Sequence, residues 1–240
     1  MHWDFALILI FLGTVVPLLG RRRIRQLMRM PETTKRDRLT LYASTIAFQW
    51  LAAVVVLWRS SAHAIPPARL GLAVPNPALT VSITLCLTAL MFANQIVSLR
   101  GLKSRPEAAL GVLPQLARKI FPQDRAERVA FFAVVITVAA CEELIYRGFV
   151  QRILQDWPGN VVVAGIFGSA AMFGLAHIYQ GRRGLLATFV VGVIFSAIRW
   201  WTGSLVPAAV AHFVADFMAG FLAPAALGAA TVTSAERGAP

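Results

Sequence analysis

The chain alternates between long apolar stretches and short polar, mostly basic connections. Seven apolar stretches approach the length of a membrane crossing: residues 3–19, 39–58, 79–99, 129–150, 161–178, 185–201 and 205–224. A membrane-spanning helix needs about 20 mostly apolar residues, because the hydrocarbon core is about 30 Å thick and a helix rises about 1.5 Å per residue. The pattern therefore predicts an all-α fold, a polytopic transmembrane helix bundle of about seven spans, with no room for a sizeable soluble domain.

The composition agrees with this interpretation. Of the 240 residues, 58% are hydrophobic and 14% are charged, whereas average soluble domains are about 25% charged. Two cysteines exclude a disulfide scaffold. A net charge of +12 would suggest nucleic acid in a soluble protein, but here the basic residues lie between apolar stretches, as in membrane proteins. The expected partner is the lipid bilayer, and no nucleic acid is expected.

The placement of Lys and Arg predicts an orientation. With seven spans and the N-terminus outside, 18 of the 23 basic residues fall on the cytoplasmic side, on residues 21–38, on residues 100–128, at Arg182 and Arg183, and in the tail. Asp4 precedes the first apolar stretch and the arginines follow it, which favours a retained span over a cleaved signal peptide. The expected location is an integral, multi-pass membrane protein, in the plasma membrane if the source is bacterial. One misplaced span would invert the orientation after residue 128.

The domain prediction separates the chain into three parts. Residues 1–126 hold the first three spans and basic cytoplasmic loops, 127–224 form a helical core with the last four spans, and 225–240 are a disordered tail. Within the first part, the pattern of residues 105–122 is compatible with two structures, an amphipathic helix on an anionic leaflet or a solvated loop.

Ionisable residues inside predicted spans are the main functional signal. A charge at mid-bilayer costs about 2.5–3.5 kcal/mol on insertion scales, so each one needs an explanation. Three of the spans contain six such residues: Glu142, Glu143, Arg147, His177, His212 and Asp216. Their clustering on three helices predicts a site within the membrane.

The spacing of these residues suggests separate roles. Glu143 and Arg147 stand at i, i+4 and can form an ion pair along one helix face, which leaves Glu142 without a local cation. A desolvated carboxylate of this kind is a candidate base or metal ligand; a purely structural network is the alternative. His212 and Asp216 are also at i, i+4, which suits an Asp that orients a His or two ligands on one metal. His177 by itself is more typical of a packing or interfacial residue.

These motifs in this order resemble the CPBP family of intramembrane proteases. Glu-Glu-x-x-x-Arg (Glu142, Glu143, Arg147) is followed by Phe-x-x-x-His (Phe173, His177) and by His-x-x-x-Asp (His212, Asp216), and Phe195 with Arg199 resembles a further element. The family takes in the type II CAAX prenyl endopeptidases and the bacteriocin-processing and self-immunity (Abi) proteins. The resemblance covers about residues 127–223, and the first three spans carry no matching motif.

The resemblance implies hydrolysis of a peptide bond in a membrane-associated or lipidated protein or peptide. By carry-over, Glu142 activates water, His177 helps to hold it, and His212 with Asp216 stabilises the oxyanion or completes the site. Glu143 and Arg147 form the supporting pair.

Members of the family are commonly labelled metalloproteases, so Zn2+ held by Glu142, His177 and His212 is one expectation and a Glu/His-type hydrolase without metal is the other. The family often has Asn where this chain has Asp216. An ionised Asp accepts hydrogen bonds but does not donate them, which favours metal ligation or orientation of His212 over oxyanion binding.

Three other functions are compatible with parts of the pattern. A proton-coupled transporter would also carry intramembrane Glu and His residues, but the inverted repeats or broken spans typical of transporters are not visible. A non-catalytic scaffold or immunity protein could keep the motif for packing. Cys141 could be a nucleophile paired with a histidine, although a buried Cys is usually a small hydrophobic residue.

Overall fold

The computed structural model describes residues 2–104, 113–157 and 159–226, and every regular element in these ranges is a helix. A first long helix joins α1 (Trp3–Ile10), a π-helical turn η1 (Phe11–Val15) and α2 (Val16–Arg29). The next elements are α3 (Lys35–Ala62), the short 3-10 turn η2 (Pro67–Leu70), α4 (Pro77–Lys103) and α6 (Leu113–Ile120). A third group joins α7 (Arg125–Glu142), a π-helical segment η3 (Glu143–Val150) and α8 (Gln151–Asp156). The chain ends with α9 (Val162–Ala176), η4 (Ile178–Gln180), α10 (Gly181–Thr202) and α11 (Val206–Ala226).

The seven predicted spans all correspond to helices, so the predicted fold class is confirmed. Five helical stretches are long and apolar enough to cross a membrane: Trp3–Arg29, Lys35–Ala62, Pro77–Lys103, Arg125–Asp156 and Ile178–Thr202. The other two predicted spans are the shorter apolar helices Val162–Ala176 and Val206–Leu222. The chain is a multi-pass integral membrane protein.

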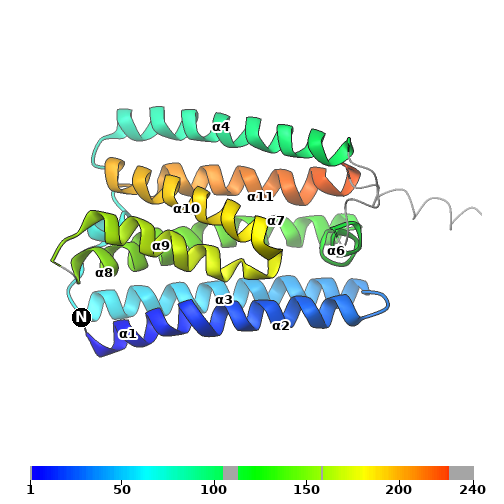
Figure 1. Ribbon diagram of the computed structural model, residues 1–240, viewed down its shortest axis with the longest axis horizontal. Coiled ribbons are helices and arrows are strands. Elements are labelled where there is room, and N and C mark those ends of the chain that lie inside the picture. The colour runs from blue at the N-terminus through cyan, green and yellow to red at the C-terminus, as the bar shows by residue number, and fades with distance from the viewer. Residues whose placement is uncertain (1, 105–112, 158, 227–240) are drawn as a thin grey trace, which may run out of the picture.

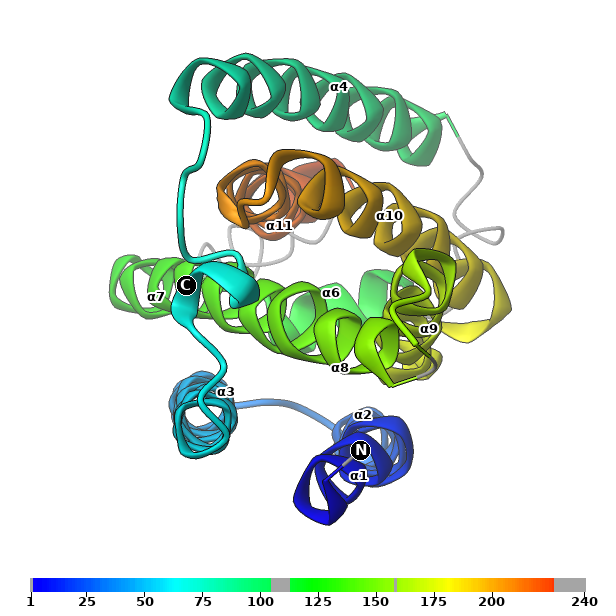
Figure 2. The same ribbon diagram turned by 90° about the vertical axis from the view of Figure 1, so that its left-hand side faces the viewer.

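The helices run roughly side by side along the long axis of the molecule (Figure 1). Seen from one end, they form tiers, with α4 outermost on one side, α10 and α11 beneath it, α7 to α9 in the middle, and α1 to α3 on the far side (Figure 2). The most extensive contacts join α4 to α11, α9 to α10, and α3 to α7. The middle tier therefore lies between the first two long helices and the pair formed by α4 and α11.

Small residues explain how closely α4 and α11 approach each other. Ala208 and Ala211 are fully buried in a cluster with Leu87 of α4 and Phe195 of α10. Gln95 of α4 donates from Nε2 to the backbone oxygen of Ala215, 3.2 Å away. Small side chains at helix contacts let backbones pack closely in membranes, which holds α11 and its polar residues in place.

Polar and apolar residues are arranged in the opposite way to a soluble protein. Glu127, Glu143 and Arg147 are completely buried, whereas large apolar side chains such as Leu85 and Val129 are about two thirds exposed, at 67% and 68%. Lipid tails can cover apolar side chains without penalty, but a charge needs a partner inside the bundle. The buried charges therefore mark contacts between helices.

One such contact fixes α3 against α7. The Arg38 guanidinium donates from Nε and Nη2 to the two carboxylate oxygens of Glu127, at 3.0 and 2.9 Å. Glu127 Oε2 also accepts a hydrogen bond from the backbone N–H of Gln123 at 2.7 Å. Nearby, Lys35 and Asp124 form an exposed ion pair at 2.7 Å. The buried pair connects the first half of the chain to the helix that carries Glu142.

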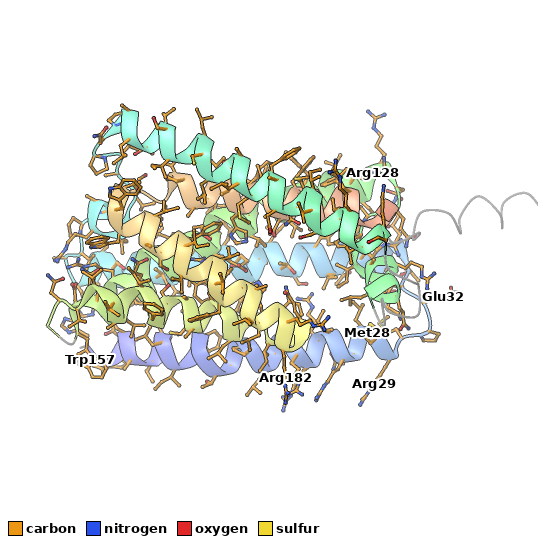
Figure 3. The ribbon with its side chains drawn as sticks, turned by 45° about the horizontal axis from the view of Figure 1, so that its top comes forward. Met28, Arg29, Glu32, Arg128, Trp157 and Arg182 are labelled. Carbon is orange, nitrogen blue, oxygen red and sulfur yellow. The ribbon has the colours of Figure 1, made fainter. Side chains whose placement is uncertain are left out.

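The two ends of the bundle differ in composition. Arg29 and Arg128 lie toward one end and Trp157 lies at the other (Figure 3). Of the six exposed tryptophans, Trp50 lies within α3, and the other five lie at or next to helix ends: Trp3, Trp58, Trp157, Trp200 and Trp201. The ends concerned, the start of α1 and the ends of α3, α8 and α10, lie at the same end of the bundle (Figure 1). Tryptophan is enriched at membrane interfaces and basic residues in cytoplasmic loops. This distribution agrees with the orientation predicted from the Lys and Arg positions.

The remaining sequence predictions concern segments only partly described. From residue 113 onward, the segment 105–122 forms α6, and Ala117 and Lys119 are buried against the rest of the bundle; residues 105–112 lie outside the described residues. Helix α11 extends through Ala226, so the start of the predicted 225–240 tail is helical, and residues 227–240 lie outside the described residues. The division into parts 1–126 and 127–224 stays a prediction.

Candidate active site

The two glutamates of the motif lie where the helical winding changes. Glu142 is the last residue of α7, and Glu143 begins the π-helical segment η3, which also contains Arg147. Wider π turns inside helices are frequent at functional sites. Every residue of η3 is buried, and Gly148 lets η2 come close, since a Cβ at that position would lie 2.9 Å from the Leu70 backbone oxygen.

Glu143 is the centre of a buried ionic network. Its Oε1 accepts hydrogen bonds from Arg147 Nη1 at 2.7 Å and from His212 Nδ1 at 2.8 Å. The Arg147 guanidinium carbon lies 4.0 Å from the ring centroid of Phe173 and 5.3 Å from that of Phe195, distances at which aromatic faces attract cations. The predicted ion pair of Glu143 and Arg147 is present, and the network ties η3 to α9, α10 and α11.

Glu142 has a different environment. Its Oε1 accepts a hydrogen bond from Gln49 Nε2 of α3 at 2.7 Å. Its Oε2 is buried and has no hydrogen-bond partner in the part of the chain that the structure describes. One carboxylate oxygen is thus held by a neutral amide and the other is available for a further hydrogen bond, as a general base requires.

His177 is the C-cap residue of α9, directly after Ala176. Its Nδ1 lies 2.9 Å from the backbone oxygen of Phe173. A carbonyl oxygen only accepts, so Nδ1 carries the proton and Nε2 of the neutral ring is an acceptor. A backbone carbonyl that fixes the tautomer in this way is typical of histidines that bind water or a metal.

Glu142, His177 and Asp216 line one cavity of about 380 Å³, although they come from α7, the end of α9, and α11. Its other polar lining residues include Gln49, Tyr146 and Tyr179, and most of the remaining wall consists of apolar side chains from η1, α2, α3 and α7. A mostly apolar cavity with a few converging polar groups is the usual form of a binding site. Three of the predicted site residues are therefore brought together.

His212 takes a position behind this cavity. It is not among the residues that line the cavity, and its side chain lies between two carboxylates. Nδ1 contacts Glu143 Oε1 and Nε2 faces Asp216 Oδ2 at 3.5 Å. The expectation that His212 faces a common space with Glu142 and His177 is thus not what the structure shows. His212 instead connects the buried Glu143 network to Asp216, whose side chain is 39% exposed.

Of the aromatic and basic residues that accompany the motifs, Phe173 and Phe195 contact the buried ionic network, and Arg199 does not line the cavity. Phe173 contacts three members of the site, with ring centroids 4.6 Å from His177 and 5.9 Å from His212 in addition to its stacking on Arg147. The ring centroid of Phe195 lies 6.2 Å from that of His212. Arg199 lies away from the cavity and donates from Nη2 to the Arg69 backbone oxygen at 2.9 Å.

The predicted metal ligands do not form a ligand cluster. No three His, Cys, Asp or Glu side chains of the described ranges lie in an arrangement that could hold a metal ion. Each of the three residues already uses one donor or acceptor atom in a hydrogen bond. His177 bonds to the Phe173 backbone oxygen, His212 bonds to Glu143, and Glu142 accepts from Gln49. The donors therefore do not converge on one point, and the use of Zn2+ stays a prediction.

Sequence reasoning missed the contribution of the first helices to the site. Gln49, Tyr42 and Thr45 of α3 and Arg23 of α2 line the cavity, although the first three spans carry no motif. Gln49 is a polar residue within a predicted span, and that signal could have found it, because polar residues inside membranes usually face other helices. The partner of Gln49 could not have been read from its position.

A comparison with protein-family models matches residues 125–218 to the family described as type II CAAX prenyl endopeptidase Rce1-like. This segment is therefore similar to that family. The match covers less than half of the chain and nearly the same residues as the resemblance inferred from the motifs. Comparisons with curated proteins and with solved structures found no match. The Rce1-like segment contains the two glutamates, both site histidines and Asp216, whereas Gln49 lies outside it.

Proposed function

We propose that this protein is an intramembrane endopeptidase that hydrolyses a peptide bond of a membrane-associated or lipidated protein or peptide, with Glu142 as the general base. The observation that supports this most directly is the shared cavity. Glu142 and His177, 35 positions apart in the chain, line it together. Glu142 offers a carboxylate oxygen that has no partner among the described residues, and His177 offers an acceptor nitrogen. The similarity to the family supports the reaction class.

The reaction follows from these two groups. A water molecule donates one hydrogen bond to Glu142 Oε2 and the other to His177 Nε2, which orients its oxygen toward a substrate carbonyl. As the oxygen attacks the carbonyl carbon, Glu142 takes the water proton. When the tetrahedral intermediate collapses, the carbon–nitrogen bond breaks and Glu142 returns the proton to the leaving nitrogen. Atoms and charges balance without a further reactant.

The remaining polar residues hold this arrangement. Gln49 orients Glu142 through the hydrogen bond to Oε1. Arg147, Glu143 and His212 form a buried chain that ends at Asp216 on the cavity wall. In this proposal Asp216 sets the orientation of His212, in keeping with a carboxylate that accepts hydrogen bonds and does not donate them.

The apolar wall fits a substrate that arrives from the membrane. Leu12, Val16, Phe48 and Ala52 line the cavity from the first two long helices. Burial of apolar surface stabilises binding by about 25 cal/mol per Å², and a largely water-excluding cavity strengthens the electrostatic contacts made during the reaction. The wall therefore supports binding of an apolar or lipidated peptide segment next to Glu142.

The test is the substitution Glu142→Gln, which keeps the size of the side chain and removes the base. We expect cleavage of a reconstituted lipidated peptide to fall by about 10²- to 10⁴-fold, while the unfolding temperature in detergent is little changed. Glu32→Gln, at an exposed position outside the helices, is the matched control and should cleave normally. Normal cleavage by Glu142→Gln would refute the proposal, and an intact biological activity without any cleavage would favour a non-catalytic scaffold.

The same assay distinguishes the two forms of the reaction. If Glu142 and His177 act without a metal, a strong chelator leaves the rate unchanged. If Zn2+ is required, the chelator abolishes cleavage and added Zn2+ restores it. Metal analysis of the purified protein gives an independent reading of the same question.

A further inference from the structure

A second cavity, of about 280 Å³, lies apart from the one that Glu142 lines. It is lined by Ala68, Arg69, Arg147, Gln151, Arg152, Gln155, Arg199 and Trp200. Four of these eight residues are arginines, and they come from η2, η3, α8 and the end of α10. Such a density of guanidinium groups is unexpected in a protein whose charged residues make up only 14% of the chain. We call it the arginine pocket.

Several donors in the arginine pocket have no hydrogen-bond partner within the described residues. Arg147 is completely buried, and its Nε and Nη2 are unpartnered. The Nε groups of Arg152 and Arg199 are buried and unpartnered as well. Gln151 is 4% exposed; its Nε2 donates to the Ser196 backbone oxygen, and its Oε1 has no partner. Buried polar groups are normally satisfied, so each of these groups calls for an explanation.

Carboxylates compensate only part of this positive charge. Glu143 pairs with Arg147, and Asp156 pairs with Arg152 and lies 3.9 Å from Arg69. In the described ranges no carboxylate forms an ion pair with Arg199, which instead donates to the Arg69 backbone oxygen. Four arginines thus share two carboxylates, and the pocket keeps a net positive charge.

The backbone around Arg199 is built to hold its side chain. Gly71, directly after η2, has a φ of +80°, a conformation that glycine adopts readily. A Cβ at Gly71 would lie 2.1 Å from Arg199 Nε, so any larger residue would displace the guanidinium. The glycine and the hydrogen bond to Arg69 together keep Arg199 beside the pocket.

We propose that the arginine pocket binds a phosphate-type oxyanion. Guanidinium groups match the oxygens of phosphate with paired N–H donors, and several can contact one phosphate group. The acceptor Oε1 of Gln151 suits a hydroxyl or ammonium group attached to that phosphate. This site is distinct from the cavity of the proposed reaction, although Arg147 lies between them.

The position of the pocket allows two sources of the anion. Trp200 on its rim and the nearby Trp201 are more than half exposed, at 54% and 59%, and Trp157 follows α8 at the same end of the molecule (Figure 3). Tryptophans of this kind lie at the level of lipid headgroups. The phosphate can therefore belong to an anionic lipid headgroup or be dissolved in the adjoining water.

The experiment measures thermal unfolding of the purified chain in alkyl maltoside micelles and a buffer without phosphate, so that neither the detergent nor the buffer supplies a phosphate group. Micelles alone, the same micelles with added inorganic phosphate, and mixed micelles containing phosphatidylglycerol are compared. A ligand that binds only the folded state raises the unfolding temperature with its concentration. Stabilisation by inorganic phosphate indicates a dissolved anion, and stabilisation by phosphatidylglycerol indicates a headgroup; both support the site. No stabilisation by either overturns it.

Variants assign the effect to the pocket. In Arg199→Gln and Arg152→Gln, about 10-fold more ligand or more should be needed for the same rise in unfolding temperature. Each variant loses a charge-assisted hydrogen bond to the anion. Arg182→Gln is the matched control, since Arg182 is exposed on α10 and lies away from the pocket (Figure 3). Comparing unfolding temperatures in alkyl maltoside micelles alone shows whether a variant is folded. An equal loss in Arg182→Gln, or unchanged responses in both pocket variants, overturns the proposal.

Discussion

Adjacent residues in the motif have contrasting environments. Each glutamate has one carboxylate oxygen without a hydrogen-bond partner among the described residues. Glu142 accepts a hydrogen bond from a neutral amide and lines the cavity, whereas Glu143 is completely buried between a guanidinium and an imidazole. Adjacent positions on a helix point about 100° apart, so the two carboxylates face different neighbours. This difference separates a group that can take a proton from one that holds the surrounding helices.

Gln49 is expected to act as a positioning residue for Glu142. Replacing it by Leu removes the hydrogen bond to Glu142 Oε1, and a hydrogen bond to a charged group contributes about 1.5–3 kcal/mol. We expect kcat to fall by about 10- to 100-fold with a much smaller change in KM, because the lost contact orients the base and does not touch the substrate. Steady-state kinetics on a lipidated peptide give both constants.

The control for this variant is Gln95→Leu. Gln95 also donates a side-chain hydrogen bond between helices, but to the Ala215 backbone oxygen and not to Glu142. If Gln95→Leu lowers kcat as much as Gln49→Leu does, the effect comes from general loosening of the bundle. Partial recovery of kcat in Gln49→Asn would further support a positioning role.

The buried network of Arg147, Glu143 and His212 should contribute strongly to the free energy of unfolding. In Arg147→Met, Glu143 would stay buried with only His212 as a partner, and removing one member of a buried pair costs about 3–5 kcal/mol. We expect that loss in the free energy of unfolding, measured by denaturant titration in detergent. Arg128→Met, an exposed change at the start of the same helix, should stay within about 0.5 kcal/mol. Equal stabilities of the two variants would contradict this role for Arg147.

At the scale of the elements, the site depends on helices from both halves of the chain. α3 contributes Gln49, and the buried Arg38–Glu127 pair fixes α3 against α7. The π-helical segment η3 carries Glu143 and Arg147 in a stretch where every side chain is buried. Because α3 carries no motif, its place in the site comes from packing alone.

Two ion pairs connect the α3 region to the α7 region, and we expect very different contributions from them to the free energy of unfolding. Arg38→Met leaves the fully buried Glu127 without its guanidinium partner, and we expect a loss of about 3–5 kcal/mol in unfolding free energy. Lys35→Met breaks a pair in which both side chains are about half exposed, and we expect little change because water screens it. The same detergent titration compares them, and similar losses would contradict the contrast.

The exposed pair also has a defined pH dependence. The hydrogen bond from Lys35 lowers the pKa of Asp124 below its ordinary value of 3.8. Because the folded pKa lies below the unfolded one, the pair stabilises the fold above that ordinary value and loses its contribution as the pH falls through the folded pKa. Lys35→Met should reduce this acid dependence without abolishing it, because the backbone N–H of Glu127 also donates to Asp124 and lowers its pKa; acid unfolding curves of the two proteins compare them.

At the scale of the whole molecule, Arg29 and Arg128 lie toward one end of the bundle and Trp157 lies at the other (Figure 3). We call the first the basic end. The Lys and Arg distribution predicts that the basic end is cytoplasmic. We expect Trp157→Cys to react with a membrane-impermeant maleimide on intact cells, and Arg29→Cys to react only after lysis. The background should lack the exposed Cys86, whereas Cys141 is buried. Labelling of both positions from one side would contradict the seven-span topology. If Arg29→Cys reacts on intact cells and Trp157→Cys only after lysis, the topology holds but the orientation is the reverse of the predicted one.

Much of the site was predictable because it depends on local spacing. The pair Glu143 and Arg147 follows from an i, i+4 spacing on one helix, and the structure contains it. The helix of His212 and Asp216 and the family of the segment 125–218 were also accessible from the motifs. By contrast, the bond between His212 and Glu143 joins residues 69 positions apart, and such a contact depends on how α11 packs against η3.

The sequence by itself determined the membrane-spanning helices, since length and hydrophobicity act within each segment and a bilayer satisfies them helix by helix. It also determined which charges would need partners. The identity of those partners depends on how the helices pack: Gln49 bonds to Glu142, and His212 bonds to Glu143. The same packing brings Glu142, His177 and Asp216 to one cavity. Side chains from distant segments meet according to the packing of whole helices, and no local pattern along the chain encodes that packing.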